Sequence, residues 1–181
     1  MAVLVRLAAA EDAAALAAVY RPFVEDSRIS FEEAAPDAAE MARRIADDGR
    51  GLFAWLVAEE DGRLLGFVNS SPFRARAAYR WAVETGIYLA ADAHGRGIGG
   101  QLLARMLDLL TAQGFTTAIA GIALPNPASV ALHEKLGFKL TGTYDRTGFK
   151  HGQWLDVGHW QRDLAPRAET PAGPRPFAEV F

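Results

Sequence analysis

The first third of the chain alternates between the apolar spacing of a strand and that of a helix. Every second residue is apolar over 3–7, and the alanine-rich run 10–20 carries acidic residues in its first turn, which predicts a helix. A second helix is predicted to begin at Pro36 and to end near Gly49, where the chain needs a left-handed residue. The residues between them, 26–35, are predicted to form a loop.

Three strands are predicted in the middle of the chain. Apolar runs over 52–58 and 64–69 flank an Asp61-Gly62 pair, which is a hairpin-turn signal. A third strand runs over 81–89, and its alternation divides it into two faces. One face holds Val83, Thr85, Ile87 and Leu89, and the other holds Glu84, Gly86 and Tyr88.

The second half of the chain predicts a strand–turn–helix–strand unit and a final strand pair. In order, the elements are a glycine-rich turn over 95–100, a helix over 101–113, a buried strand over 115–124, a short helix over 127–135, and strands over 138–143 and 154–162. These elements predict an α+β fold, in which a mixed, mostly antiparallel central sheet has helices on both faces. We expect one domain over 1–164 and an extended, proline-rich tail over 165–181.

Composition narrows the classes of function. The chain has no cysteine, which excludes disulfides, thiolate nucleophiles and cysteine-ligated zinc, and no metal site is predicted. A formal net charge of −3 with both signs interspersed gives no reason to expect nucleic acid or a membrane as partner. Glu11 and Asp12 interrupt the apolar N-terminal stretch before it could span a bilayer, so we expect a soluble, cytoplasmic protein.

The glycine-rich turn is the first candidate site. His94-Gly95-Arg96-Gly97-Ile98-Gly99-Gly100 stands where a strand turns into a helix, so backbone N–H groups there can reach an anion such as pyrophosphate. Arg96 could add a full positive charge. The loop alone is equally compatible with a sharp bend that binds nothing, and it lacks the ending of a P-loop.

A longer pattern resembles the GNAT acetyltransferases. It consists of His94-x-x-Gly97-x-Gly99, an amphipathic helix, a strand, and Asn126-x-x-Ser129-x-x-x-His133-x-x-x-Gly137-Phe138. His94 departs from the family, which usually has Gln or Arg at that position. Since such a loop binds mainly through its backbone, we expect a modest effect on affinity.

Further segments resemble one subfamily, the phosphinothricin and related amino-acid N-acetyltransferases. They are Arg74-Ala-Arg76 to Tyr79, Trp81 to Glu84, Ala112 to Phe115, Leu124-Pro-Asn126, Leu132-His133-Glu134, and Lys150-His-Gly to Trp160-Gln-Arg-Asp163. The likeness runs from about Val5 to Pro176. It implies a GNAT fold and transfer of an acetyl group from acetyl-CoA to the α-amine of phosphinothricin, methionine sulfoximine or a similar compound, with herbicide or antibiotic resistance as a consequence.

The resemblance also implies the acetyl-CoA site. It maps a backbone N–H for the oxyanion, and pairing with the pantetheine arm, onto Ile87–Leu89. There Gly86 indicates either a bulge or splay of the strand that exposes these groups, or only close packing. The expected contacts are Ile87, Tyr88, Leu89, Gly95, Arg96, Gly97, Ile98, Gly99, Gly100, Asn126 and Ser129. Asn126 is first of all expected to cap the short helix, with a cofactor contact second.

Two residues match the family's catalytic positions. Glu84 is the proposed base, but an unperturbed glutamate would take a proton from an α-ammonium uphill by about 7 kcal/mol, so either burial raises its pKa or water relays the proton. Its alternative is a solvated strand glutamate. His133 stands where many GNAT enzymes have a tyrosine that protonates the departing thiolate, and its alternative is a packed histidine bonded to a backbone carbonyl.

The substrate's anionic end is expected to meet Arg76 and Tyr79, with Phe31 as a wall of the pocket. From composition alone, Arg74, Arg76 and Arg80 would be a solvated cluster. Two alternatives to the small-molecule enzyme remain: a protein N-terminal or lysine acetyltransferase, and a non-catalytic CoA-binding module. The resemblance also implies a homodimer.

Overall fold

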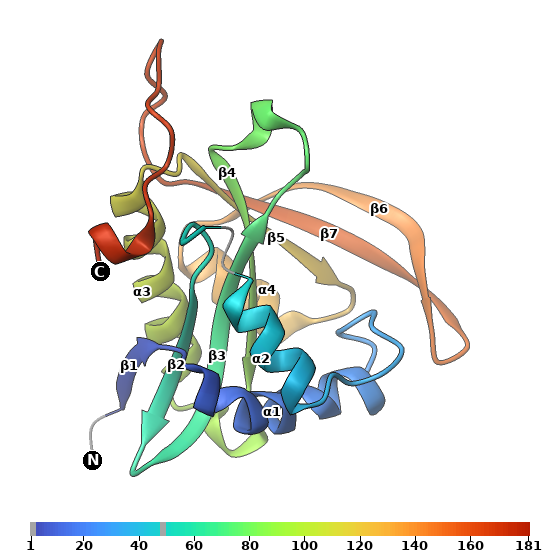
Figure 1. Ribbon diagram of the computed structural model, residues 1–181. Coiled ribbons are helices and arrows are strands. Elements are labelled where there is room, and N and C mark those ends of the chain that lie inside the picture. Colours follow the sequence, from blue (N-terminus) through green and yellow to red (C-terminus); the bar gives the residue numbers. More distant parts are fainter. Residues whose placement is uncertain (1–2, 48–49) are drawn as a thin grey trace.

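A seven-stranded sheet organises the molecule (Figure 1). The computed structural model describes residues 3–47 and 50–181, so the predicted stop at Gly49 lies outside the described residues. The strands are β1 Leu4–Leu7, β2 Trp55–Glu60, β3 Arg63–Pro72, β4 Ala82–Leu89, β5 Thr117–Ala123, β6 Lys139–Lys150 and β7 Gln153–Asp163. They lie in the order β1-β2-β3-β4-β5-β7-β6, and every neighbouring pair is antiparallel except β4 and β5. The predicted mixed, mostly antiparallel sheet is confirmed.

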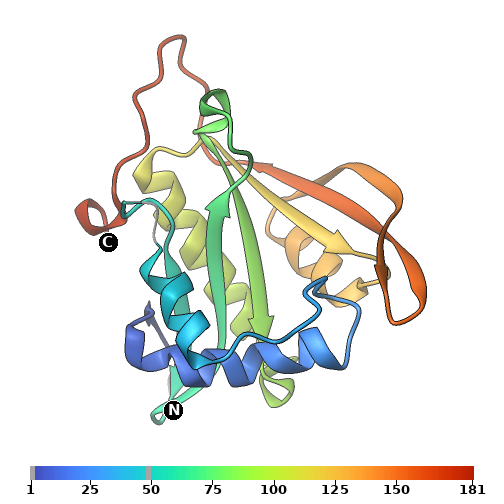
Figure 2. The same cartoon turned by 45° about the vertical axis from the view of Figure 1, so that its right-hand side comes forward.

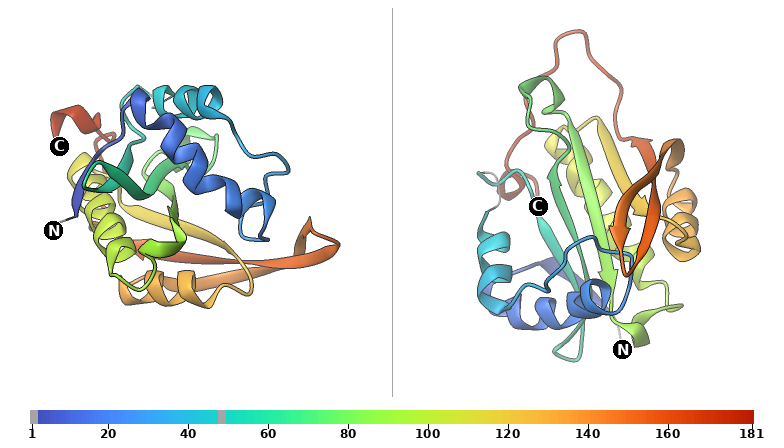
Figure 3. Two further views of the ribbon diagram at one scale, coloured as in Figure 1. Left: turned by 90° about the horizontal axis from the view of Figure 1, so that it is seen from below. Right: turned by 90° about the vertical axis from the view of Figure 1, so that its right-hand side faces the viewer.

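Helices cover both faces of the sheet (Figure 3). They are α1 Ala13–Glu25, α2 Ala38–Ala46, α3 Ile98–Gln113 and α4 Pro127–Lys135. Because strand side chains alternate, Val57 and Phe67 pack with α1 and α2, while Leu56 and Val68 pack with α3 on the opposite face. The α+β architecture therefore buries two apolar layers, one on each side of the sheet.

The parallel pair at the centre of the sheet separates soon after it begins. β4 pairs with β5 only from Ala82 to Glu84, and beyond Glu84 the two strands diverge (Figure 2). On its other side β4 stays paired with β3 as far as Leu89, in a regular register in which Gly86 lies opposite Asn69. Gly86 therefore marks no bulge, and the divergence leaves one edge of β4 open over 85–89.

Two elements are longer than the sequence pattern predicts. α1 continues five residues past Tyr20 and contains Pro22, because Val24 in its last turn is buried in the core. β6 and β7 form a long hairpin whose turn residues, His151 and Gly152, have φ of 46° and 73°. Most of β6 is exposed and polar, so its sequence lacks the alternation that identifies a half-buried strand.

The C-terminal tail folds back against α3 (Figure 1). The Gln113 Nε2 at the end of α3 donates to the carbonyl oxygens of Leu52 and Arg175 at 3.1 and 2.9 Å. Phe177 donates its backbone N–H to the Gly51 carbonyl at 2.7 Å, and its side chain packs against the core. The tail therefore adds apolar contacts to the domain rather than extending freely from it.

Candidate active site

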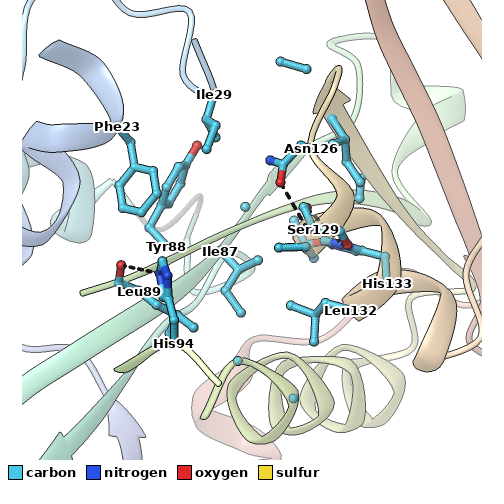
Figure 4. A pocket seen from close by; sticks show the side chains of 18 of the residues that line it. Phe23, Ile29, Ile87, Tyr88, Leu89, His94, Asn126, Ser129, Leu132 and His133 are labelled. Atoms are coloured by element: carbon cyan, nitrogen blue, oxygen red, sulfur yellow. Dashed lines mark hydrogen bonds between the residues drawn. The ribbon is translucent and has the colours of Figure 1, made fainter. Parts of the chain in front are cut away.

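A cleft lies between the diverging halves of β4 and β5 (Figure 4). Its volume is about 370 Å³, and it extends from the start of α3 to α4. Its walls are mainly apolar and include Ile87, Leu89, Ile122 and Leu132. We call it the donor cleft. An open strand edge on each side of an apolar slot can pair with an extended, amide-containing chain.

The glycine-rich loop closes one end of the donor cleft. Gly95 and Gly97 have φ of 74° and 78°, a conformation that favours glycine, and Gly97 is the N-cap of α3. A Cβ atom added at Gly95, Gly97 or Gly100 would meet no other atom within 4 Å, so the backbone there faces open space. Free N–H groups at the start of a 16-residue helix, with about half a positive charge, suit a phosphate-like anion.

Two side chains predicted to contact the cofactor point elsewhere. Arg96 donates to both carboxylate oxygens of Glu60 at 2.8 Å, which offsets its charge. The Ile98 side chain is buried in the core below α3. Neither side chain lines the donor cleft, so only their backbone groups are available to a ligand there. His94 does line it, and its Nε2 donates to the Leu89 carbonyl at 3.3 Å (Figure 4).

A second cleft of about 330 Å³ lies on the α1–α2 side of the sheet. We call it the acceptor pocket. Its lining includes Tyr20, Glu32, Arg44 and Glu84. Four residues line both clefts, namely Thr85, Gly86, Tyr88 and Gly121. The donor cleft and the acceptor pocket therefore meet where β4 and β5 separate.

Glu84 lies at this junction, on the last paired position of β4. Its carboxylate accepts no hydrogen bond from any described residue, and burial raises its pKa above the usual range, opposed by the charges of His159 and Arg74. A Cβ atom at Gly121 would lie 3.1 Å from Glu84 Oε1, so a larger residue there would push on the carboxylate. A half-buried carboxylate with a raised pKa is suited to take up a proton near neutral pH.

His133 is buried in α4, beside the donor cleft (Figure 4). Its Nδ1 donates to the Ser129 carbonyl at 2.8 Å, whereas its Nε2 is buried and has no partner among the described residues. Burial lowers the His133 pKa, so the neutral ring is favoured. The Nδ1 bond to a backbone carbonyl is the one expected of a packed histidine, and the buried Nε2 is left without a partner among the described residues. Asn126 caps α4, since its Oδ1 accepts from the Ser129 N–H at 3.2 Å.

Of the four residues predicted to bind the substrate, Glu84 lines the acceptor pocket, whereas Phe31, Arg76 and Tyr79 line neither cleft. Arg76 and Tyr79 are exposed in the turn between β3 and β4, where the Tyr79 ring stands edge-on to Phe73 at 5.6 Å between centroids. Phe31 lies over Gly148 of β6, and the neighbouring Ile29 lines the donor cleft instead. Sequence spacing alone does not determine where such loops lie.

Three residues that line neither cleft but act on groups around them were missed by the sequence-based prediction. Arg74 acts electrostatically on Glu84, although only its neighbours Arg76 and Tyr79 were selected. His159 stands opposite Gly121 in the β5–β7 register. Lys150 is buried and donates to the carbonyls of Val24, Ser30 and Glu32 at 2.5, 2.6 and 2.9 Å. It thereby ties the loop after α1 to β6. A lysine within the Lys-His-Gly motif was the available signal.

Comparison with known proteins shows the family of this chain. Residues 16–138 match the model of the acetyltransferase (GNAT) family, and the chain belongs to that family. It is 39% identical over 179 residues to a phosphinothricin N-acetyltransferase of Streptomyces viridochromogenes, covering 97% of this chain and 93% of the relative. It is 31% identical over 172 residues to an L-methionine sulfoximine/L-methionine sulfone acetyltransferase of Pseudomonas aeruginosa PAO1, covering 94% and 100%.

A solved structure extends the comparison to three dimensions. The crystal structure of a phosphinothricin acetyltransferase from Sinorhizobium meliloti in complex with acetyl-CoA superposes with a TM-score of 0.90 at 40% identity, covering 95% of this chain and 94% of that one. The predicted GNAT fold and subfamily resemblance are thus confirmed.

Among the helices of the described residues, none has the length and apolar character needed to cross a bilayer.

The contribution of the three Lys150 hydrogen bonds, which we call the Lys150 clasp, can be tested by measuring the free energy of unfolding. Lys150→Met keeps the aliphatic stem but removes the ammonium, which leaves three carbonyls without their donor. We expect the free energy of unfolding to fall by about 2–4 kcal/mol, measured by urea denaturation. Lys139→Met, at an exposed position of β6, is the control and should change it by less than about 0.5 kcal/mol. Equal stabilities of the two variants would contradict the clasp.

Proposed function

We propose that this chain transfers an acetyl group from acetyl-CoA to the α-amine of phosphinothricin, methionine sulfoximine or a similar amino-acid analogue. One observation carries the proposal: an apolar slot between two open strand edges meets a separate pocket at a half-buried carboxylate. The names of the relatives at 31–39% identity support the substrate class. Acetylation removes the free amine of such compounds, so we also propose that the enzyme confers resistance to them.

The residues of the donor cleft fit acetyl-CoA, which supplies the acetyl group as an activated thioester. Backbone N–H groups of Gly95–Gly100 would hold the pyrophosphate, and the open edge at Ile87–Leu89 would pair with the pantetheine arm and donate to the developing oxyanion. The Asn126 amide nitrogen is free to donate, since its oxygen caps α4. Ser129 Oγ lies at 3.4 Å from His133 Nδ1, at the same wall.

Glu84 is the proposed base that takes the proton from the substrate ammonium. Burial raises its pKa, which reduces the uphill step for that transfer, and the acceptor pocket would present the amine at the junction. His133 is the proposed acid for the departing sulfur. Because the neutral ring is its resting form, it would have to gain a proton at Nε2 before donating it.

The substrate's anionic end is proposed to meet the arginine-bearing segment 73–80, with Arg76 and Tyr79 as direct contacts and Phe31 as a neighbouring wall. Arg74 is an additional candidate because its charge acts on Glu84. A planar guanidinium donates two parallel hydrogen bonds to a carboxylate or phosphinate, whereas analogues without these oxygens would leave it unpaired.

A homodimer in the cytoplasm completes the proposal. β6 and β7 expose four large apolar side chains, with exposed fractions of 54–62%: Leu140, Tyr144, Phe149 and Trp154. A second copy of this chain is the proposed cover for this surface, since clustered apolar side chains of this size favour burial in an interface.

The first prediction tests the glycine-rich loop. Gly100→Ala adds a methyl group into open space at a residue with ordinary helical φ, so the fold should be unchanged or slightly stabilised. If the N–H groups there hold the pyrophosphate, the methyl group obstructs its approach, and acetyl-CoA affinity should fall by about 10-fold or more. Calorimetry measures the affinity. An unchanged dissociation constant would remove this end of the loop from the site.

The second prediction tests the base. Glu84→Gln keeps the shape of the side chain but cannot accept the proton, so kcat should fall by about 10²–10⁴-fold, while acetyl-CoA affinity changes little. Release of free CoA thiol measures the rate. A kcat within a few-fold of wild type would return Glu84 to the role of an ordinary strand residue, and wild-type protein that binds acetyl-CoA without turning over any amine would favour the non-catalytic alternative.

The third prediction separates the two arginines. Arg76→Ala should lower kcat/KM by about 10–150-fold for phosphinothricin, mainly through KM, and much less for amines with neutral side chains. Arg74→Ala is the matched variant from the same turn. A larger loss in Arg74→Ala would transfer the anion contact to Arg74. Equal losses for every amine, or faster turnover of peptides than of amino-acid analogues, would contradict the small-molecule assignment.

The fourth prediction concerns assembly. A double variant, Phe149→Ser with Trp154→Ser, should shift the light-scattering mass from dimer to monomer, because it removes both rings of a pair whose centroids lie 5.2 Å apart. Leu4→Ser, at an equally exposed leucine on β1, is the control and should remain dimeric. A monomeric wild-type protein would refute the dimer.

A further inference from the structure

A histidine of β7 lies near the candidate base Glu84, on the far side of Gly121 of β5. His159 of β7 is paired in register with Gly121 of β5. A Cβ atom at Gly121 would lie 3.1 Å from Glu84 Oε1 and 3.8 Å from His159 Nε2. The carboxylate and the imidazole thus face the same point from two strands, and the missing side chain at position 121 leaves that point open.

The space between the two groups suits a water molecule. No hydrogen bond or ion pair joins Glu84 directly to His159 within the described part of the chain, yet both polar atoms lie within 4 Å of one point. A bound water needs two or more polar partners. Glu84 Oε1 provides one hydrogen-bond acceptor, and His159 Nε2 provides the second polar partner. Any residue at 121 larger than glycine would fill the gap.

We propose that His159 is the next proton acceptor after Glu84, reached through a water molecule held over Gly121. The N–H bond of the substrate ammonium breaks as an O–H bond forms on Glu84. That O–H bond then breaks as a proton passes through the water to His159 Nε2, which releases it to solvent. No electrons are exchanged, and the lone pair left on nitrogen attacks the acetyl carbon. The inference rests on the proposed function, since it extends the path that begins at Glu84.

The chemistry of the two groups agrees with this order. Imidazole is a common proton shuttle in proteins, and an intermediate acceptor divides one long proton transfer into shorter steps. Burial raises the pKa of Glu84, which makes its carboxylate a better acceptor for the ammonium proton.

Three neighbouring strands place groups beside the histidine. Glu84 approaches it from β4, Gly121 of β5 is its register partner, and the Tyr144 ring of β6 stands edge-on at 4.8 Å between centroids. Arg74 acts on Glu84 from the turn before β4. His159 is half-buried and Tyr144 is exposed, so the imidazole has a short path to solvent through the hairpin.

The test combines two variants that reach the same gap from different sides. His159→Asn removes the imidazole ring, and Gly121→Ala adds a methyl group that narrows the space between Glu84 and His159. Each should lower kcat by about 10–100-fold at neutral pH and change the dependence of kcat/KM on pH, and His159→Asn should leave acetyl-CoA affinity within twofold of wild type. Added imidazole should partly restore the rate of His159→Ala. His151→Asn, at the exposed turn of the same hairpin, should keep the wild-type profile.

The outcomes distinguish this inference from the proposed function. If Glu84→Gln is inactive while folded His159→Asn and Gly121→Ala keep the wild-type rate and pH profile, the relay is refuted and the acetyltransferase stands. If His159→Asn does not fold, the Gly121→Ala profile decides, and an unchanged profile there refutes the relay. If the wild-type protein acetylates no amine, the proposed function itself fails.

Discussion

The separation of β4 from β5 is the constraint on which the rest of the site depends. Two parallel strands pair over only three positions, and both then leave an edge unpaired in the interior of the sheet. Backbone N–H and C=O groups without a hydrogen-bond partner cost free energy when they are removed from water. The divergence therefore creates an opening whose edges favour a ligand that can hydrogen-bond to them. The sheet can tolerate this because β4 remains fully paired with β3, and β5 with β7. The open edges are therefore held by rigid neighbours rather than by loops.

Chemistry follows from where the strands separate. Glu84 is the last residue of β4 that pairs with β5. It therefore lies at the start of the opening, where the donor cleft and the acceptor pocket meet. Gly121 on β5 leaves room for its carboxylate, and burial disfavours the charged form, which raises its pKa. The neighbouring segments form the walls around Glu84. The glycine-rich loop and α3 terminate one end of the donor cleft, and the loop tied down by Lys150 forms a wall of the other side.

The sequence predicted what depends on local spacing. The alternation over 81–89 correctly divided the strand into a face with Glu84 and Tyr88 and a face with Ile87, and the glycine pattern correctly located the loop before α3. What could not be predicted depends on contacts between distant segments. The position of Arg76 and Tyr79 follows from how the turn between β3 and β4 lies on the fold, and the approach of His159 to Glu84 follows from the β5–β7 register. Lys150 binds carbonyls more than a hundred residues away, which no local pattern reveals.

The most direct measurement of the central claim is a crystal structure of this chain with a bisubstrate analogue, in which the sulfur of CoA is linked through an acetyl spacer to the nitrogen of phosphinothricin. The account predicts that the pantetheine arm lies between β4 and β5 and the linked nitrogen lies beside Glu84, where Gly86 and Gly121 line both clefts. The amine end of the amino-acid part should then lie in the acceptor pocket, and its anionic end should reach the arginine-bearing segment 73–80. An analogue whose pantetheine arm lies outside the donor cleft, or whose nitrogen is remote from Glu84, would contradict the account.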